Sequence, residues 1–166
     1  MNWLINIYID EQLLELTRDN KVFRSWRIAS AKNGPGEISG SECTPRGAHY
    51  IRAKIGQGAE ENAVFIGRRA TGEIYQPPLR IQHPQRDWIL TRIMWLCGLE
   101  PGRNRGGNVD TLRRYVYIHG CPDEDVMGIP SSHGCIKMRN AEILELFDLI
   151  PAGTRVHIFE TRPEIA

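Results

Sequence analysis

Residues 115–138 read YVYIHGCPDEDVMGIPSSHGCIKM, and the interpretation of the whole chain depends on this stretch. It contains the tripeptide His-Gly-Cys twice, at 119–121 and again at 133–135. The aromatic and β-branched residues at 115–118 predict a strand that ends at His119. Two histidines and two cysteines this close together could form a metal site, a redox pair, or one catalytic pair with a similar tripeptide beside it.

A zinc site is the first alternative, because two histidines and two cysteines could complete a tetrahedral ligand set. Structural zinc ligands usually come in pairs separated by about two to four residues, whereas only a glycine separates each histidine from its cysteine here. A redox pair is disfavoured as well, because Cys121 and Cys135 lack the C-x-x-C arrangement. We therefore expect no metal and no cofactor, and a zinc-binding or ligand-binding module without enzymatic activity stays an alternative.

A nucleophilic cysteine is the third alternative, and it requires fewer residues than a zinc site. A thiol with a pKa of about 8.5 is mostly protonated at neutral pH, so a histidine must take its proton or stabilise its thiolate. Backbone N–H groups must also face the position where the attacked carbonyl oxygen becomes negative. Gly134 permits a sharp turn before Cys135, and this turn could present consecutive amides as an oxyanion hole. His119, at the end of a neighbouring strand, could then approach the same thiol.

The segments YVYIHG at 115–120 and SSHGCIKM at 131–138 together resemble the signature of the YkuD-type L,D-transpeptidases. In that family, a strand ending in His-Gly is followed by a loop and then by Ser/Thr-His-Gly-Cys. The opening residues 5–32, the TPRG turn at 44–47 and the closing segment 140–160 are also similar to the family. The resemblance therefore covers nearly the whole chain.

The resemblance implies a mainly β fold, namely a YkuD-like β-sandwich with one C-terminal helix packed near the active-site loop, in a single domain spanning 1–166. The residue pattern gives a helix at 141–150, with Asn140 as its cap, because apolar residues recur there at helical spacing. Proline pairs predict a long irregular segment with one short strand at 56–87. Further strands are expected at 4–10, 13–17, 22–30, 48–55, 88–96, 113–120 and 154–159.

The family's roles can be placed on matching positions. The resemblance implies that Cys135 is the nucleophile and His119 is its base, with His133 and Gly134 beside them in the catalytic group. The amides of Gly134 and Cys135 would donate to the oxyanion, and the backbone of Gly120 would orient the imidazole. The positions expected to contact substrate are Ser132, Gly120, Lys137 and Tyr117.

Three features depart from the family pattern. Only twelve residues separate His119 from Ser132, which is a short loop for the family. Lys137 stands where the family commonly has Arg or Asn, so a bidentate role is not expected of it. Cys121 occupies a position where many relatives have a small polar residue. We interpret Cys121 as a look-alike thiol, either inert or able to cap Cys135 under oxidation.

The resemblance also implies the reaction, which is acyl transfer on peptidoglycan stem peptides or muropeptides. The thiolate attacks the carbonyl of the meso-diaminopimelate that precedes a terminal D-alanine, and a thioester remains. The N-terminus shows no signal peptide, so we expect a cytoplasmic L,D-carboxypeptidase of murein recycling. The alternative is a periplasmic L,D-transpeptidase that forms cross-links and whose export signal is missing from this chain. Acylation by carbapenems is implied in both cases.

The composition limits the partners further. Twenty-one basic residues against twenty acidic ones give a net charge of +1, which argues against nucleic acid or an anionic membrane surface. No apolar run approaches the roughly 18 residues of a membrane helix, so no membrane insertion is expected. The glycine-rich loop at 98–114 carries Arg103, Arg105, Arg113 and Arg114. We interpret these as solvated charges, with recognition of substrate carboxylates by Arg103, Arg105 or Arg113 as the sharper alternative.

Overall fold

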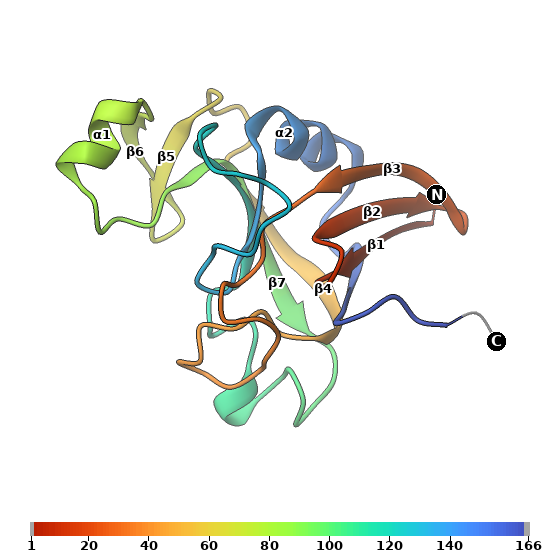
Figure 1. Cartoon of the computed structure of the whole chain (residues 1–166). Helices are drawn as coiled ribbons and strands as arrows, with labels where there is room; N and C mark the ends of the chain where they lie inside the picture. Colours follow the sequence, from red (N-terminus) through yellow and green to blue (C-terminus); the bar gives the residue numbers. More distant parts are fainter. Residues whose placement is uncertain (1, 165–166) are drawn as a thin grey trace.

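The computed structural model describes residues 2–164, in which ten strands form one curled sheet (Figure 1). Its strand order is β3-β2-β1-β10-β4-β7-β5-β6, with β8 paired to β7 and β9 paired to β8. The expected mainly β fold is confirmed. The strands are β1 (Trp3–Tyr8), β2 (Leu13–Arg18), β3 (Lys21–Arg27), β4 (Gly47–Ile55), β5 (Ala63–Ile66), β6 (Arg69–Ile74), β7 (Ile89–Gly98), β8 (Tyr117–Cys121), β9 (Ile136–Arg139) and β10 (Arg155–Phe159), and the α-helices are α1 (Pro77–Gln82) and α2 (Asn140–Leu149).

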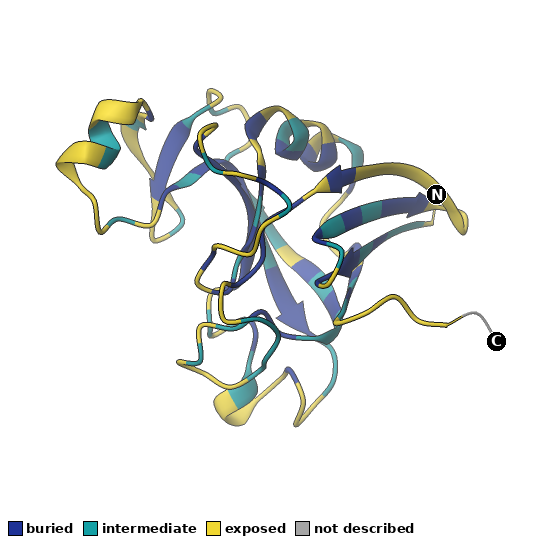
Figure 2. Cartoon of the chain, in the orientation of Figure 1, coloured by how far each residue is buried: buried dark blue, intermediate teal, exposed yellow. Residues whose placement is uncertain are grey.

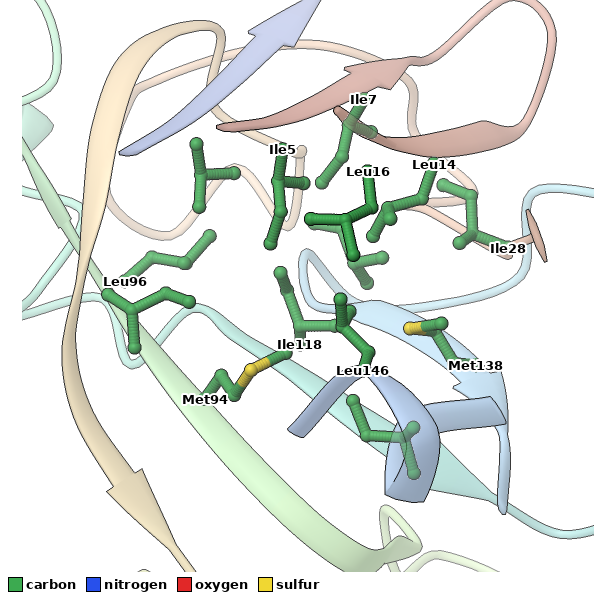
Figure 3. Packing of buried hydrophobic residues seen from close by; sticks show 14 of the residues in the cluster. Ile5, Ile7, Leu14, Leu16, Ile28, Met94, Leu96, Ile118, Met138 and Leu146 are labelled. Atoms are coloured by element: carbon green, nitrogen blue, oxygen red, sulfur yellow. The ribbon is translucent and has the colours of Figure 1, made fainter. Parts of the chain in front are cut away.

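The main hydrophobic core lies between the β1–β2 part of the sheet and the layer formed by β7, β8, β9 and α2 (Figure 3). Ile5 and Ile7 alternate along β1 and are fully buried, as the period of a strand requires. They face Met94 of β7 and Ile118 of β8 across the core. Burial of each such side chain contributes about 2 kcal/mol to stability. This packing fixes β8 and β9, which carry the two tripeptides.

The segment 56–87 is more regular than its prolines suggest. It contains the β5–β6 hairpin and α1, where we expected an irregular excursion with one short strand. Pro77 and Pro78 occupy the first turn of α1, where the missing proline N–H has no helical partner to lose. The prolines therefore start a helix instead of breaking one. Both α1 and β3 are mostly exposed, whereas β7 and β8 are buried (Figure 2).

The helix α2 packs against β7, β8 and β9, which places it beside the strands of the two tripeptides. The prediction that Asn140 caps this helix is wrong, because Asn140 is its first helical residue and Arg139 occupies the cap position. The buried Asn140 side chain turns inward instead. Its amide donates to Cys121 O at 2.9 Å and accepts from Thr91 Oγ1 at 2.6 Å. The Asn140 amide thus provides a hydrogen-bond donor for the Cys121 carbonyl at the end of β8 and does not cap the helix.

Candidate active site

The parallel pairing of β8 and β9 brings the two tripeptides side by side. His119 pairs with Lys137 in this register. Two residues earlier on each strand, Cys135 lies level with Tyr117, and the Tyr117 N–H donates to Cys135 Sγ at 3.3 Å. The thiol is therefore held by the strand that carries His119.

His119 and the Cys135 thiol lie on the same face of the sheet. Side chains two residues apart on a strand point to one face, so Tyr117 and His119 share a side. His119 also pairs with Ile93 of the antiparallel strand β7, and opposite residues in such a pair share a face. Cys135 packs against the cluster that contains Ile93 and Tyr117. The first tripeptide thus contributes its histidine and the second its cysteine to one site.

The His119 imidazole is almost fully buried, and one of its nitrogens is fixed. Nδ1 lies 2.6 Å from Gly120 O, and a carbonyl oxygen only accepts, so Nδ1 carries the hydrogen and Nε2 a free lone pair. Burial lowers the pKa of His119, and the Lys137 charge lowers it further, while Asp87 and Asp125 oppose this shift. The imidazole is therefore neutral at neutral pH and can accept a proton at Nε2.

Cys135 is partly exposed as a residue, whereas its sulfur is buried, 3.3 Å from Tyr117 N and 3.5 Å from Tyr115 O. Burial of the sulfur raises the pKa of Cys135 to about 12, and the Asp87 carboxylate adds to this. The Tyr117 N–H and the Arg114 guanidinium act in the opposite direction. At rest the pair is a neutral thiol and a neutral imidazole.

The neutral pair predicts a specific pH dependence for acylation of Cys135. Because burial lowers the pKa of His119 below its ordinary value of 6.5, the free base persists at neutral pH and is lost only in acid. We expect kcat/KM to be nearly constant between pH 6.5 and 8 and to fall below that range as Nε2 becomes protonated. A pH profile of acylation measures this. A midpoint above pH 7 would show that the imidazole is not the neutral base described above.

The turn before the nucleophile is held by two buried hydroxyl groups. Ser132 Oγ accepts the Gly134 N–H at 3.1 Å and donates to Cys135 O at 2.6 Å. Thr44 Oγ1 donates to Gly134 O at 3.0 Å, which ties the TPRG turn to this site. Gly134 has φ of 133°, and a Cβ there would lie 3.2 Å from Cys43 O, so the turn requires glycine. Ser132 and Thr44 therefore shape the turn, and the Gly134 amide is engaged by Ser132.

His133 is exposed and lines two pockets. One pocket, of about 300 Å³, also contains Arg113 and Tyr115. The other, of about 140 Å³, is more enclosed and contains Asp87 and Lys137. His133 thus lies between two spaces that flank the turn before Cys135, and neither is lined by His119 or Cys135, so its place in the catalytic group stays a prediction.

The remaining predicted residue, Lys137, is engaged in the smaller pocket. Its Nζ lies 2.8 Å from Asp125 Oδ2 and donates to Ser131 Oγ at 3.0 Å. Asp125 also pairs with Arg80 of α1 at 2.9 Å. Asp125 therefore ties the loop between β8 and β9 to both α1 and Lys137, and the charge of Lys137 is compensated. A role in substrate binding stays a prediction for Lys137.

Gly120 leaves no room for a side chain. A Cβ at this position would lie 2.5 Å from Asn140 Oδ1 and 2.6 Å from Leu90 O. We expect Gly120→Ala to lower the free energy of unfolding by about 1–3 kcal/mol. It should also lower kcat/KM by about 10- to 100-fold, because the carbonyl that holds the His119 imidazole must shift. Chemical unfolding and acylation kinetics measure the two effects, and wild-type values in both would contradict the close packing.

Arg114, which the sequence analysis interprets as a solvated charge, connects a distant loop to the site. Its Nη2 donates to Cys43 O at 2.6 Å and its Nη1 donates to Glu37 O at 3.1 Å. These acceptors are neutral carbonyls, so the guanidinium charge still acts on the Cys135 sulfur. No spacing rule reveals this contact, because the loop lies about 70 residues away in sequence.

Of the three arginines considered for substrate carboxylates, Arg105 is exposed, and Arg103 and Arg113 line different pockets. Arg103 forms a half-exposed ion pair with Glu100 at 3.3 Å and lines a pocket of about 470 Å³, which contains neither His119 nor Cys135. Arg113 lines a pocket that contains His133, and Arg114 of the same loop lines it too. Recognition of a substrate carboxylate by this loop stays a prediction.

Cys121 lies apart from Cys135. It pairs with Arg139, four residues beyond Cys135, which corresponds to about 13 Å along the strands. A disulfide needs Cα atoms within about 7 Å, so Cys121 cannot cap Cys135 in this fold. Cys121 is 1% exposed, its thiol donates to Met138 O at 3.3 Å, and burial raises its pKa to about 12. Among residues 2–164, no three metal-ligating side chains lie together.

These features define a cysteine–histidine site at the edge of parallel strands in a mainly β fold. The model of the YkuD family, the L,D-transpeptidase catalytic domain, matches residues 2–158. The chain therefore belongs to this family. It is 51% identical over 145 residues to a Bacillus subtilis protein named "Putative L,D-transpeptidase YqjB", covering 87% of this chain and 64% of that protein. The chain thus spans less than two thirds of the length of this relative.

Solved structures show the same fold. A variant of the Enterococcus faecium L,D-transpeptidase superposes with a TM-score of 0.58 at 21% identity, covering 96% of this chain and 50% of that one. The catalytic domain of the E. faecium enzyme, acylated by ertapenem, gives a TM-score of 0.56 at 22% identity, with 95% and 97% covered. The expected YkuD-like fold is therefore confirmed. Within residues 2–164, no helix has the length and apolar character needed to cross a bilayer.

Proposed function

We propose that the chain is a cysteine acyltransferase that cleaves the bond between meso-diaminopimelate and D-alanine in peptidoglycan stem tetrapeptides. One observation carries this proposal. The thiol of the partly exposed residue Cys135 shares a face with His119, whose Nδ1–H is held by Gly120 O so that Nε2 can accept a proton. Membership of the L,D-transpeptidase family supports the choice of substrate.

Acylation follows from this geometry. His119 Nε2 takes the proton as Cys135 Sγ attacks the carbonyl carbon, and the imidazolium then gives that proton to the leaving amine of D-alanine. The carbon–nitrogen bond breaks and a thioester remains. We assign stabilisation of the oxyanion to the Cys135 amide, because the Gly134 amide already donates to Ser132 Oγ.

The acceptor of the acyl group decides the product. Water requires no binding site of its own, so we propose hydrolysis to the tripeptide, an L,D-carboxypeptidase reaction, as the basal outcome. An amine from a second stem peptide would give a cross-link instead. The relatives named L,D-transpeptidases favour this second outcome. Both outcomes share the acylation step at Cys135.

Incubation with a disaccharide tetrapeptide, followed by mass spectrometry, tests the proposal. Release of D-alanine with a tripeptide supports hydrolysis, and a cross-linked dimer supports transfer to an amine. A parallel incubation with ertapenem should give a stable adduct that maps to Cys135. Absence of turnover together with stoichiometric zinc in the purified protein would contradict the acyltransferase and support the metal-binding alternative.

A further inference from the structure

Arg68 lies on a platform of aromatic rings, two of which, Trp95 and Tyr117, belong to the hydrophobic cluster against which Cys135 packs. Arg68 lies at the tip of the β5–β6 hairpin, with its Cζ 4.6 Å from the ring centroid of Trp95 and 4.9 Å from that of Tyr115. Its Nη1 donates to Tyr117 Oη at 3.0 Å. The backbone N–H of the same Tyr117 donates to Cys135 Sγ. Tyr117 therefore contacts the guanidinium through its side chain and the Cys135 sulfur through its backbone N–H.

The charge of Arg68 has no acidic partner in the part of the chain that the structure describes. A guanidinium has five N–H donors, and the hydrogen bond to Tyr117 uses one of them. Cations around the smaller pocket differ in this respect. Arg80 pairs with Asp125 at 2.9 Å, and Arg86 pairs with Glu73 at 2.9 Å. Arg68 is thus a partly exposed cation beside the site whose remaining donors are available to a ligand.

The hairpin turn does not account for an arginine at this position. Gly67 and Arg68 both have positive φ, of 56° and 65°, in the two-residue turn between Ile66 and Arg69. Such turns favour glycine or asparagine at both central positions, and a long side chain is disfavoured there. The aromatic platform, in contrast, holds the guanidinium in one orientation. The side chain of Arg68, and not the backbone turn, therefore explains the residue type.

We propose that Arg68 forms a carboxylate-binding position beside Cys135 and selects acyl donors that carry a free carboxylate near the scissile carbonyl. A planar guanidinium with a free edge matches a carboxylate in bidentate geometry, and stacking on two rings reduces the entropy lost on binding. The identity of the donor rests on the proposed function. In a stem tetrapeptide, the carboxylate is that of the terminal D-alanine or the second carboxylate of diaminopimelate.

Alkylation of Cys135 tests the position without any peptide substrate. Iodoacetate and iodoacetamide differ in one carboxylate, and with both the sulfur–carbon bond forms as iodide leaves and the thiol proton goes to His119. We expect the rate with iodoacetate divided by the rate with iodoacetamide to fall at least about fivefold in Arg68→Met. This ratio should be partly retained in Arg68→Lys. Peptide mapping restricts the measurement to Cys135, and thermal unfolding checks the fold of each variant.

Arg69→Met is the matched control, because it removes the same charge from the neighbouring exposed residue of the hairpin. Its rate ratio should equal that of the wild-type protein. An unchanged ratio in Arg68→Met, or equal falls in Arg68→Met and Arg69→Met, would overturn the carboxylate-binding position.

Stem peptides then identify which carboxylate is bound. Wild-type protein and Arg68→Met are compared on the tetrapeptide, on its C-terminal amide and on the form amidated at diaminopimelate. We expect Arg68→Met to lower kcat/KM about 10- to 100-fold on the tetrapeptide and to have no effect on the form that lacks the bound carboxylate. Equal losses on all three peptides would overturn the inference. Absence of turnover by the wild-type protein would contradict the proposed function, while the alkylation ratio still decides the role of Arg68.

Discussion

Replacement of Cys135 with Ala is expected to lower the release of D-alanine from a stem tetrapeptide by at least about 10⁴-fold, to the background rate. The reaction requires a covalent bond to sulfur, and the thiol of Cys121, the other cysteine of the doubled tripeptide, is buried and donates to Met138 O. Mass spectrometry of the products measures the loss. The same variant should give no ertapenem adduct. Thermal unfolding should change little, because this residue is partly exposed.

Cys121→Ala is the matched control, since it removes a thiol from the other copy of the same tripeptide. Burial raises the pKa of both thiols to about 12. Cys121, however, is 1% exposed, and its thiol donates to Met138 O within the core. We expect turnover within about twofold of wild type and a small loss of stability. Similar losses of turnover from Cys121→Ala and Cys135→Ala would favour the metal or disulfide interpretation over the catalytic one.

The sequence pattern was informative where a residue's environment is set by its near neighbours. The alternation of Ile5 and Ile7 predicted β1, and the aromatic and β-branched residues before His119 predicted β8. The sequence pattern failed where one residue type can have two structural roles. A proline can begin a helix or end one, and Pro77 and Pro78 begin α1. An asparagine can cap a helix or form a hydrogen bond in the core, and the Asn140 amide donates to Cys121 O at the buried end of β8. Tertiary packing, not local preference, decided both cases.

The site could be predicted only in part for a similar reason. The two tripeptides are identical in sequence, and only the register of β8 and β9 shows that Cys121 lies about 13 Å from the level of Cys135. Arg114 and Arg68 look like ordinary solvated charges in the sequence, although Arg68 lies in a distant hairpin and the acceptors of Arg114 lie about 70 residues away. Their partners are backbone carbonyls and aromatic rings, and no spacing rule encodes these.

His119→Asn separates the two tasks of the imidazole, which are to hold a hydrogen bond and to accept a proton. The asparagine amide can donate to Gly120 O where Nδ1–H does at 2.6 Å, but it has no basic nitrogen in place of Nε2. We expect kcat/KM to fall about 10²- to 10⁴-fold while the free energy of unfolding changes by less than about 2 kcal/mol. Acylation kinetics and chemical unfolding measure these changes.

The pH profile of His119→Asn gives a second readout that a purely structural role would not move. Without a neutral base, the attack depends on the ionised thiol, whose pKa burial raises to about 12, so the remaining rate should increase with pH throughout the range from 6 to 9. The wild-type profile should instead be flat above pH 6.5. His133→Asn is the comparison, because this exposed histidine lies beside the same turn, and its loss should be smaller, about tenfold or less. A larger loss in His133→Asn, with a flat profile kept in His119→Asn, would make His133 the base and leave His119 to support β8.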